Sequence, residues 1–294
     1  MASKRIDTSG RFGSIIATPY IVFLLAFGVI PPVYAVYVSL VNTTDGTFAG
    51  IDNYVRAFSD FRFLPSLVNV GVYTALWLPM MLVGVVVLAL MLRARRGRVS
   101  SAMRLVYYLP SAVTGAANVL LWLFIMDPSV GPFGGLLNMF GFTHRSDILQ
   151  ADSLPLVMAL IAFTHGAGAW IVIVYGGLQN VSAEVIEAAT VDGCNAVQLA
   201  WYIELPLIRK YLTYMLIVSI AGGIQLFVEP QLIYQIARVG QPWWSLNQLA
   251  YYLGFNDGAL GVASAISVLL LVVSTIAAVV VIRKTRFFET EVPK

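Results

Sequence analysis

Residues 259–282 read ALGVASAISVLLLVVSTIAAVVVI, an unbroken run without a charged side chain. About 20 predominantly apolar residues in an α-helix are enough to cross the hydrocarbon core of a bilayer. Five further apolar stretches reach that length. They cover residues 15–41, 66–92, 105–126, 154–178 and 211–233. The sequence therefore predicts an all-α membrane protein with six transmembrane helices.

The composition agrees with burial in lipid. Of the 294 residues, 59% are hydrophobic and 11% are charged, and the mean hydropathy is +0.82. Soluble domains carry about 25% charged residues, so this chain has too few charges to cover two water-facing domains. Cys194 is the one cysteine, which excludes an internal disulfide, and no Cys/His pair has the spacing of a metal site.

The first span has an alternative interpretation. Lys4, Arg5 and Arg11 precede its apolar run, as basic residues precede the core of a cleaved signal peptide. The run is too long for such a core and lacks a convincing cleavage site. We therefore expect a retained helix after a cytoplasmic segment over residues 1–14.

The basic residues predict the orientation, because Lys and Arg accumulate in short cytoplasmic loops. Fourteen of the 18 basic residues fall on one side of the predicted spans. They are Lys4, Arg5, Arg11, Arg93, Arg95, Arg96, Arg98, Arg104, Arg209, Lys210, Arg283, Lys284, Arg286 and Lys294. Both termini, including a tail over residues 283–294, are thus expected in the cytoplasm around a membrane domain over 15–282. This distribution favours a topology signal over a nucleic-acid interface.

The outer loops are rich in aromatic residues. Trp243, Trp244, Tyr251 and Tyr252 suit the headgroup zone of the membrane. Contact with an external partner or with a sugar ring is the alternative.

Motifs for independent catalysis are missing from the sequence. There is no Gly-x-x-x-x-Gly-Lys-Ser/Thr phosphate loop, no Gly-x-Ser-x-Gly elbow and no His-Glu-x-x-His. Within the predicted spans, His165 and Glu229 are the candidate ionisable groups, whereas ion-coupled transporters usually place several there. An enzyme and a secondary transporter are both disfavoured, and energy for uphill transport would come from another chain.

One long cytoplasmic loop, residues 179–210, has its own helical pattern. Ser182 is placed to cap a helix, and Asp192-Gly193 to end it. Asn195 and Gln198 resemble a capping box for a second helix that ends at Pro206. We expect two short helices joined by a tight turn. On physical grounds alone, a self-packed loop and an element that docks on a partner are equally consistent with this pattern.

The run Glu187-Ala188-Ala189-Thr190-Val191-Asp192-Gly193, followed by Ile203-Glu204-Leu205-Pro206, resembles the signature loop of binding-protein-dependent ABC importer permeases. The resemblance implies a coupling helix seated on an ATPase subunit, with Glu187 facing the ATPase and Gly193 permitting the turn. The loop residues carried over are Glu187, Ala188, Ala189, Asp192, Gly193, Ile203, Leu205 and Pro206. The sequence departs from the usual pattern at Ser182, Cys194, Ala200 and Lys210, which affects the expected docking geometry.

Other segments resemble the carbohydrate-type permeases of this family, in particular the first, maltose-permease-like subunit. These are Gly50-Ile51-Asp52-Asn53-Tyr54 and the run from Gly258 through Gly261 to Ala265. The resemblance implies the six-helix type I importer fold in a bacterial inner membrane. It also implies a second permease subunit, two ATPase subunits that bind Mg-ATP, and an extracytoplasmic binding protein, with no cofactor in this chain. A permease for a non-sugar solute, an ion-coupled transporter and a non-transporting scaffold are the alternatives.

A sugar path through helices needs polar groups that match hydroxyls, together with flat apolar rings. The candidates are Thr114, Asn118, His165, Trp170, Gln225 and Glu229. Gln225 and Glu229 lie four residues apart and are expected on one helix face, with Pro230 loosening the helix. Four of them have a structural alternative: Glu229 reaching the outer interface, His165 packing beside Gly166 and Gly168, and Thr114 and Asn118 tying helices together.

Overall fold

The computed structural model describes residues 8–94 and 97–285, with side chains from Ile16 onward. It consists of helices, joined by turns and an isolated antiparallel bridge between Val41 and Phe48. The chain divides into two compact units. The first comprises residues 1–60 and 250–269, and the second comprises residues 61–249 and 270–294.

Among the described residues, five helical stretches are long and apolar enough to cross a membrane. They are Ile16–Ser39, Phe63–Ala94, Leu154–Gln179, Arg209–Ala237 and Leu260–Thr285. A bent pair, Arg98–Ala112 and Gly115–Ile125, supplies a sixth span if the two parts are counted together. The six predicted spans thus correspond to five stretches and one bent pair among the described residues.

The first unit contains α1 (Thr8–Phe23), a π-helical turn (Leu24–Val29), α2 (Ile30–Ser39) and α3 (Asp52–Ser59). Asn53 organises it: its side-chain amide donates to the carbonyls of Ser39 and Val41, both at 3.0 Å. The Ser39 hydroxyl is 2.8 Å from the hydroxyl of Tyr54. These bonds fix the end of α2 against the start of α3.

The start of α16 (Leu260–Thr285) packs against the same asparagine. A Cβ atom at Gly261 would lie 2.6 Å from the Asn53 amide nitrogen. The Gly-Ile-Asp-Asn-Tyr run and Gly261 are therefore two sides of one contact.

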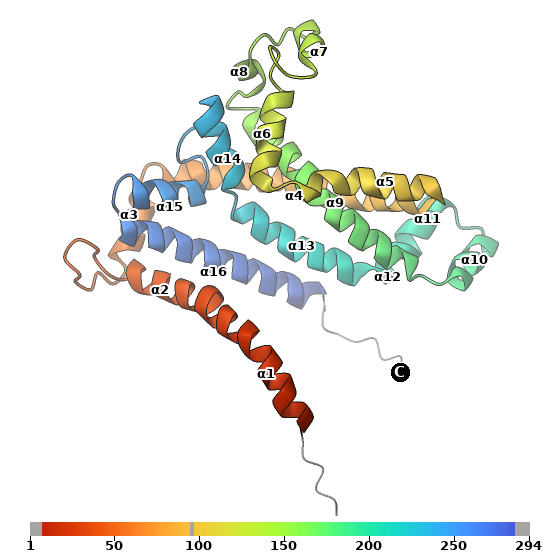
Figure 1. Cartoon of the computed structure of the whole chain (residues 1–294), viewed down its shortest axis with the longest axis horizontal. Helices are drawn as coiled ribbons and strands as arrows, with labels where there is room; N and C mark the ends of the chain where they lie inside the picture. The colour runs from red at the N-terminus through yellow and green to blue at the C-terminus, as the bar shows by residue number, and fades with distance from the viewer. Residues whose placement is uncertain (1–7, 95–96, 286–294) are drawn as a thin grey trace, which may run out of the picture. The chain divides into compact units, whose positions relative to one another are not determined.

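The second unit is built on α4 (Phe63–Ala94), α9 (Leu154–Gln179) and α13 (Arg209–Ile224), which pack side by side (Figure 1). The buried side chains of α4 recur every three or four residues and form one face. They are Phe63, Ser66, Val70, Tyr73, Trp77, Met81, Val85, Ala89 and Leu92. Small residues bring the helices close together: a Cβ atom at Gly84 would lie 2.7 Å from the Phe163 ring.

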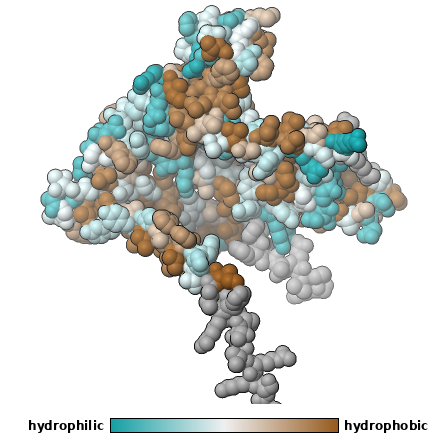
Figure 2. All heavy atoms as spheres, in the orientation of Figure 1, coloured by the Kyte–Doolittle hydropathy of each residue, from teal (hydrophilic) through white to brown (hydrophobic). Residues whose placement is uncertain are grey.

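The opposite face of α4 stays apolar although it is exposed. Leu67, Val83 and Val87 are 44%, 62% and 46% exposed. Figure 2 likewise shows apolar side chains over much of the visible face, including the part formed by α6. A lipid environment accepts such side chains directly.

The expectation of one continuous helix over residues 105–126 is wrong. α5 (Arg98–Tyr108) runs into a 3₁₀ turn (Leu109–Ala112), and α6 (Gly115–Ile125) leaves at an angle of 102°. Pro110 withholds an N–H group from the helix ladder. Val113 and Thr114 are extended, and the Thr114 hydroxyl accepts from the Ala117 N–H at 3.4 Å, which starts a new helix.

The fifth span is also interrupted, so Gln225 and Glu229 do not share a continuous helix face as expected. α13 ends at Ile224, and α14 (Val228–Leu232) begins after a break, followed by a π-helical turn (Ile233–Ala237). Pro230 lies in the first turn of α14, where a missing N–H costs little. The interruption is thus ahead of the proline rather than at it.

Side chains from the next segment satisfy the carbonyls at this break. The Ser245 hydroxyl donates to the Leu226 carbonyl at 2.7 Å, and the Asn247 amide donates to the Gln225 carbonyl at 2.8 Å. Pro230 has no N–H to donate to Leu226, so Ser245 takes the place of a helical hydrogen bond. The break is therefore a built feature rather than a frayed end.

The two tryptophans that precede α15 (Leu246–Phe255) differ in burial. Trp244 is 7% exposed and belongs to the core, so its assignment to the headgroup zone is wrong. Trp243 packs edge-on against Phe61 and lies under the Arg62 guanidinium.

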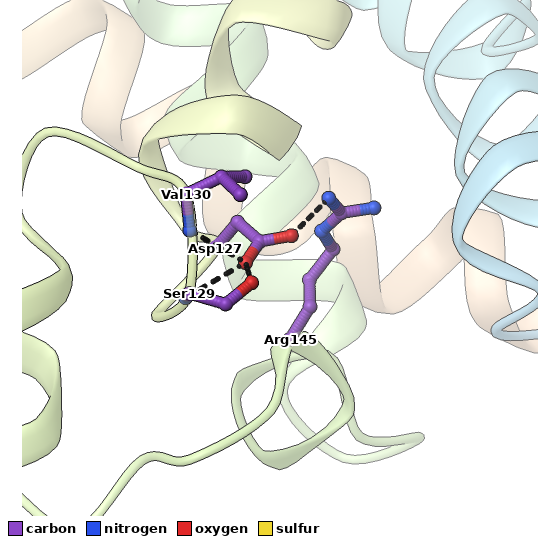
Figure 3. Close-up of polar contacts among 4 residues, drawn as sticks. All are labelled: Asp127, Ser129, Val130 and Arg145. Carbon is purple, nitrogen blue, oxygen red and sulfur yellow. Dashed lines mark hydrogen bonds and ion pairs between the residues drawn. The ribbon is translucent and has the colours of Figure 1, made fainter.

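The loop after α6 carries α7 (Gly134–Met139) and α8 (Arg145–Ile148), which lie beyond the end of α6 in Figure 1. Asp127 anchors this loop (Figure 3): its carboxylate accepts from the Ser129 hydroxyl at 2.6 Å and pairs with Arg145 at 2.5 Å. The hydrogen bonds from Ser129, and then those from Arg145, lower the pKa of Asp127 to about 2.

Candidate functional site

The coupling loop predicted over residues 179–210 connects the end of α9 to the start of α13 (Figure 1). It folds as α10 (Ala183–Val191) and a second helical segment. That segment comprises α11 (Ala196–Leu199), a π-helical turn (Ala200–Glu204) and α12 (Leu205–Leu207). The expectation of two short helices joined by a turn agrees with this arrangement.

Gly193 closes α10 in a Schellman motif. The Gly193 N–H donates to the Thr190 carbonyl at 3.1 Å, and the Cys194 N–H donates to the Ala189 carbonyl at 3.0 Å. Gly193 has a φ of +83°, a conformation that disfavours residues with a side chain. Apart from Gly193 and its two chain neighbours, no heavy atom of the described residues lies within 4 Å of the position of a Cβ at Gly193. The positive φ, rather than a lack of space for a side chain, is therefore the reason that glycine is required at this position.

The second helix starts at the predicted capping box. The Gln198 N–H donates to the Asn195 side chain at 2.9 Å, and the Asn195 N–H donates to the Gln198 side chain at 2.9 Å. Two details differ from the sequence analysis. Ser182 is the N-cap residue of α10 but makes no side-chain capping bond, and Pro206 lies inside α12, which continues to Leu207.

The loop presents apolar and acidic groups that the described residues leave uncovered. Glu187, Ala188 and Asp192 are exposed, whereas Ala189 is 5% exposed and faces inward. Four large side chains of the loop are also exposed: Val191 at 87%, Val197 at 77%, Trp201 at 67% and Tyr202 at 71%. A self-packed loop would bury such side chains, so the geometry favours a docking element.

Glu204 and Arg93 form a contact that sequence reasoning missed. Arg93 Nε lies 2.9 Å from Glu204 Oε1, and the Glu204 residue is 4% exposed. From the sequence, Arg93 is interpreted only as a basic residue that indicates topology. Glu204, between Ile203 and Leu205, is given no role. The feature of the sequence that could have indicated this contact is the acidic Glu204 within an apolar helical run.

A cleft of about 1690 Å³ lies beside the loop. Its walls come from α4, α5, α9 and both helices of the loop. Val86 and Leu90 line it on one side, and Ile186, Trp201 and Glu204 line it on the other. The coupling loop therefore forms part of the cleft wall and does not lie flat on the spans.

Four of the predicted solute-pathway residues are engaged in the fold. The Asn118 amide donates to the Ile161 carbonyl at 2.9 Å and joins α6 to α9. Thr114 caps α6, and the Trp170 ring packs edge-on against Tyr214 at 5.4 Å. The Gln225 amide lies 3.5 Å from the Ser274 hydroxyl. The Asn118 contact fits the structural alternative of a residue that ties two helices together, whereas Thr114 caps its own helix.

His165 and Glu229 have a different environment. Glu229 is within electrostatic range of His165 and of Tyr73. The His165 Nδ1 atom is buried and has no hydrogen-bond partner among the described residues. The structure thus brings these two candidates near one another, on α9 and α14.

Further polar atoms in the membrane domain are buried without a partner in the described part of the chain. They are Thr74 Oγ1 and Trp77 Nε1 of α4 and Ser219 Oγ of α13. A Cβ atom at Gly223 would lie 3.1 Å from Thr74 Oγ1 and 3.3 Å from the Trp77 ring, so α4 and α13 meet here. Buried polar groups normally have hydrogen-bond partners. Water or the hydroxyls of a solute would supply them.

The sequence matches the family described as binding-protein-dependent transport system inner membrane component over residues 46–287. The arabinooligosaccharides transport system permease protein AraP of Bacillus subtilis is 25% identical over 277 residues, which cover 93% of this chain and 88% of AraP. The sn-glycerol-3-phosphate transport system permease protein UgpA of Rhizobium meliloti is 27% identical, over 88% of this chain and 89% of UgpA.

The fold is similar to that of a bacterial ABC transporter involved in the import of the acidic polysaccharide alginate. The TM-score is 0.79 at 19% identity, over 95% of this chain and 96% of that chain. A second structure, of the alginate transporter in complex with alginate pentasaccharide-bound periplasmic protein, gives a TM-score of 0.78 at 18% identity, over 94% of each chain. At these identities the likeness shows the fold alone.

The family match covers all but the first span, and the fold agrees along nearly the whole chain. The apolar spans fit a multi-pass protein of the inner membrane. The chain belongs to the family of binding-protein-dependent transport system inner membrane components, the permease subunits of ABC importers.

Proposed function

We propose that this chain forms half of the membrane pathway for uptake of a sugar or sugar-like solute. A second, unlike permease subunit completes the pathway, and an extracytoplasmic binding protein delivers the solute. Two ATPase subunits that hold Mg-ATP dock on the cytoplasmic loops, one of them on residues 179–210. Closure of the ATPases displaces the loops and turns the spans toward an outward-facing state.

The coupling loop is the observation that carries this proposal. The capping box and the Schellman motif fix its two helices, while Glu187 and the apolar Val191, Val197 and Trp201 stay exposed. A rigid helix pair with an uncovered apolar surface suits insertion into a groove of a partner. The sequence contains no phosphate-binding loop of its own.

The polar atoms in the spans favour a neutral polyhydroxyl solute. Thr74, Trp77 and Ser219 offer hydroxyl and indole groups that have no hydrogen-bond partner among the described residues, and the Trp77 ring stacks on Tyr73 at 5.8 Å. The six predicted spans contain no Lys or Arg, whereas recognition of a phosphate ester normally uses cationic side chains. We therefore place a sugar ahead of a glycerol phosphate, although UgpA is among the relatives.

The test is accumulation in proteoliposomes by the purified assembly with its binding protein. Labelled neutral oligosaccharides and labelled glycerol 3-phosphate serve as probes. We expect ATP-dependent uptake of a neutral oligosaccharide, and we expect Gly193→Pro to remove the ATPase from the purified assembly. Gly176→Ala, at an exposed helical position of α9 with open space around it, is the matched control.

The alternatives give different results in the same vesicles. Uptake driven by an ion gradient, with no ATPase present, would show an ion-coupled secondary transporter. ATP-driven uptake of glycerol 3-phosphate alone would show a permease for a non-sugar solute.

A further inference from the structure

Arg93 joins three elements of the second unit at one point. It lies in the last turn of α4, its Nε atom pairs with Glu204 at 2.9 Å, and its Nη1 atom donates to the Leu178 carbonyl. Glu204 belongs to the second helix of the coupling loop, and Leu178 to the last turn of α9. A single guanidinium therefore connects the loop to two apolar spans.

Both partners of the ion pair are shielded from water. The Glu204 side chain is 6% exposed, and the Arg93 side chain is 15% exposed. An exposed ion pair holds two elements together weakly. A pair with so little exposure is different, because removal of one partner leaves the other charge poorly hydrated and without compensation. The ion pair therefore couples movement of the loop to movement of the end of α4.

The end of α9 also helps to position the Arg93 side chain. The carbonyl ends of a helix carry partial negative charge, which favours a cation at the last turn. Arg93 also reaches two acceptors with different N–H groups of its planar fork, which a lysine ammonium does not reproduce. The residue thus holds the loop at a set position relative to both α4 and α9.

Two of the three glutamates of the loop, Glu187 and Glu204, differ in burial. Glu187 on α10 is exposed, on the side proposed to meet the ATPase, whereas Glu204 is buried against the spans. Beyond Arg93, α4 carries Thr74 and Trp77, the buried polar residues beside α13. A displacement of the loop therefore has a continuous route through Glu204, Arg93 and α4 to these polar groups.

We propose that the Arg93–Glu204 ion pair is the positioning contact that transmits movement of the coupling loop to α4 and α9. This inference rests on the proposed docking of an ATPase on the loop. Glu204 is dispensable for that docking in this view, because it faces away from the ATPase side. Its loss uncouples ATP hydrolysis from rearrangement of the spans.

The experiment uses the intact assembly in proteoliposomes, purified through a tag on this chain. A reporter thiol, Thr74→Cys, is placed in a Cys194→Ser background, which removes the one native cysteine. Two quantities are measured: the amount and hydrolysis rate of the bound ATPase, and the labelling rate of the reporter by a water-soluble thiol reagent. Labelling is compared without nucleotide and after trapping with Mg-ATP and vanadate.

With Arg93 and Glu204 in place, we expect nucleotide trapping to change the labelling rate of the reporter. Glu204→Gln keeps the ATPase bound and hydrolysing but loses that change. The charge-reversed pair, Arg93→Glu with Glu204→Arg, regains part of that change, because it restores the ion pair but not the donor to the Leu178 carbonyl. Asp152→Asn, the neutralisation of an exposed acid in the loop after α6, behaves like the parent protein.

Three results overturn the inference. The first is Glu204→Gln with a bound ATPase and an unchanged nucleotide effect, and the second is failure of the charge-reversed pair to regain any of the effect while the ATPase stays bound. The third is loss of the ATPase in Glu204→Gln, which would make the pair only a support for the shape of the loop. An assembly that lacks an ATPase even with both residues intact would instead refute the proposed function.

Discussion

Gly168 on α9 faces the backbone of the preceding span. A Cβ atom there would lie 2.3 Å from the Tyr107 carbonyl oxygen and 3.0 Å from the Tyr108 Cα. Backbone atoms do not move aside as the end of a flexible side chain does. At Gly166, two residues earlier, the nearest atom is the Met81 terminal methyl at 3.5 Å, an ordinary contact distance.

We expect Gly168→Ala to lower the thermal unfolding midpoint of the detergent-purified chain, at a cost of about 1–3 kcal/mol from overpacking. Gly166→Ala is the matched control and should leave the midpoint nearly unchanged or raise it, since alanine favours helix. The measurement is thermal unfolding followed by circular dichroism. Equal midpoints for the two variants would contradict the close approach of α9 to the residues around Tyr107.

The residues that could be predicted from sequence are those whose role is local. The helix end at Gly193 and the capping box of Asn195 and Gln198 depend on neighbours within five residues, so their pattern is visible in the sequence. The pairing of Arg93 with Glu204 depends on the packing of distant segments. No local pattern carries that information, so the pair was missed.

Among the elements, the interrupted fifth span depends on a hydroxyl from outside it. Ser245 donates to the Leu226 carbonyl at 2.7 Å and is fully buried. We expect Ser245→Ala to destabilise the chain by about 1–3 kcal/mol, because the carbonyl would be left without its partner. The thermal midpoint in detergent is the readout.

Ser267→Ala is the control for that variant. The Ser267 hydroxyl donates to the Ala263 carbonyl at 3.0 Å inside α16. This carbonyl also accepts a backbone hydrogen bond within the helix. This control should change the midpoint little. A Ser245→Ala variant as stable as the control would show that the break does not need the hydroxyl.

The loop with α7 and α8 should respond to acid through Asp127. Its folded-state pKa of about 2 lies below the unfolded value of 3.8, so its contribution to loop stability is complete above about pH 4. That contribution is lost as the pH falls toward 2, because protonation removes the acceptor for Ser129 and the partner of Arg145. Hydrogen exchange at the Ser129 and Val130 amides between pH 5 and pH 2 measures this change.

The same measurement on Asp127→Asn gives the control. An amide does not titrate in this range, so its exchange should follow only the ordinary chemical dependence on pH. Identical profiles for the carboxylate and the amide would contradict the role of Asp127.

The breaks inside spans three and five could not be predicted from hydropathy. Residues 105–126 and 211–233 are as apolar as a continuous helix requires, and a window average does not register a turn. Pro110 and Pro230 stand out in the sequence. A proline can lie either at a kink within a helix or in the first turn of a new helix, so its presence alone does not distinguish the two. The structure places Pro230 in a first turn, after the break at residues 225–227.

For the whole molecule, composition and span lengths predicted the membrane class because both sum over the entire chain. The distribution of basic residues makes one further prediction, that both termini are cytoplasmic. Alkaline phosphatase inserted after Gly141, in the loop with α7, should be active. The same enzyme inserted after Gly97, between α4 and α5, should be inactive, and a fluorescent protein fused after Lys294 should fluoresce.

The reversed pattern, with activity at Gly97 and none at Gly141, would place the coupling loop outside the cell. It would then contradict the docking of an ATPase there as well as the orientation. Expression levels measured with an epitope tag separate low activity from low abundance.

The contact between Asn53 and Gly261 has a consequence for how this sequence can change over generations. The two residues are more than two hundred positions apart, yet a Cβ atom at 261 would lie 2.6 Å from the Asn53 amide nitrogen. Mutation of the glycine alone would displace the amide that holds the carbonyls of Ser39 and Val41. Descendants that lose Gly261 should also have replaced Asn53, so the two positions should change together. Recombination between distant relatives within the gene segment that separates the two positions should therefore be selected against.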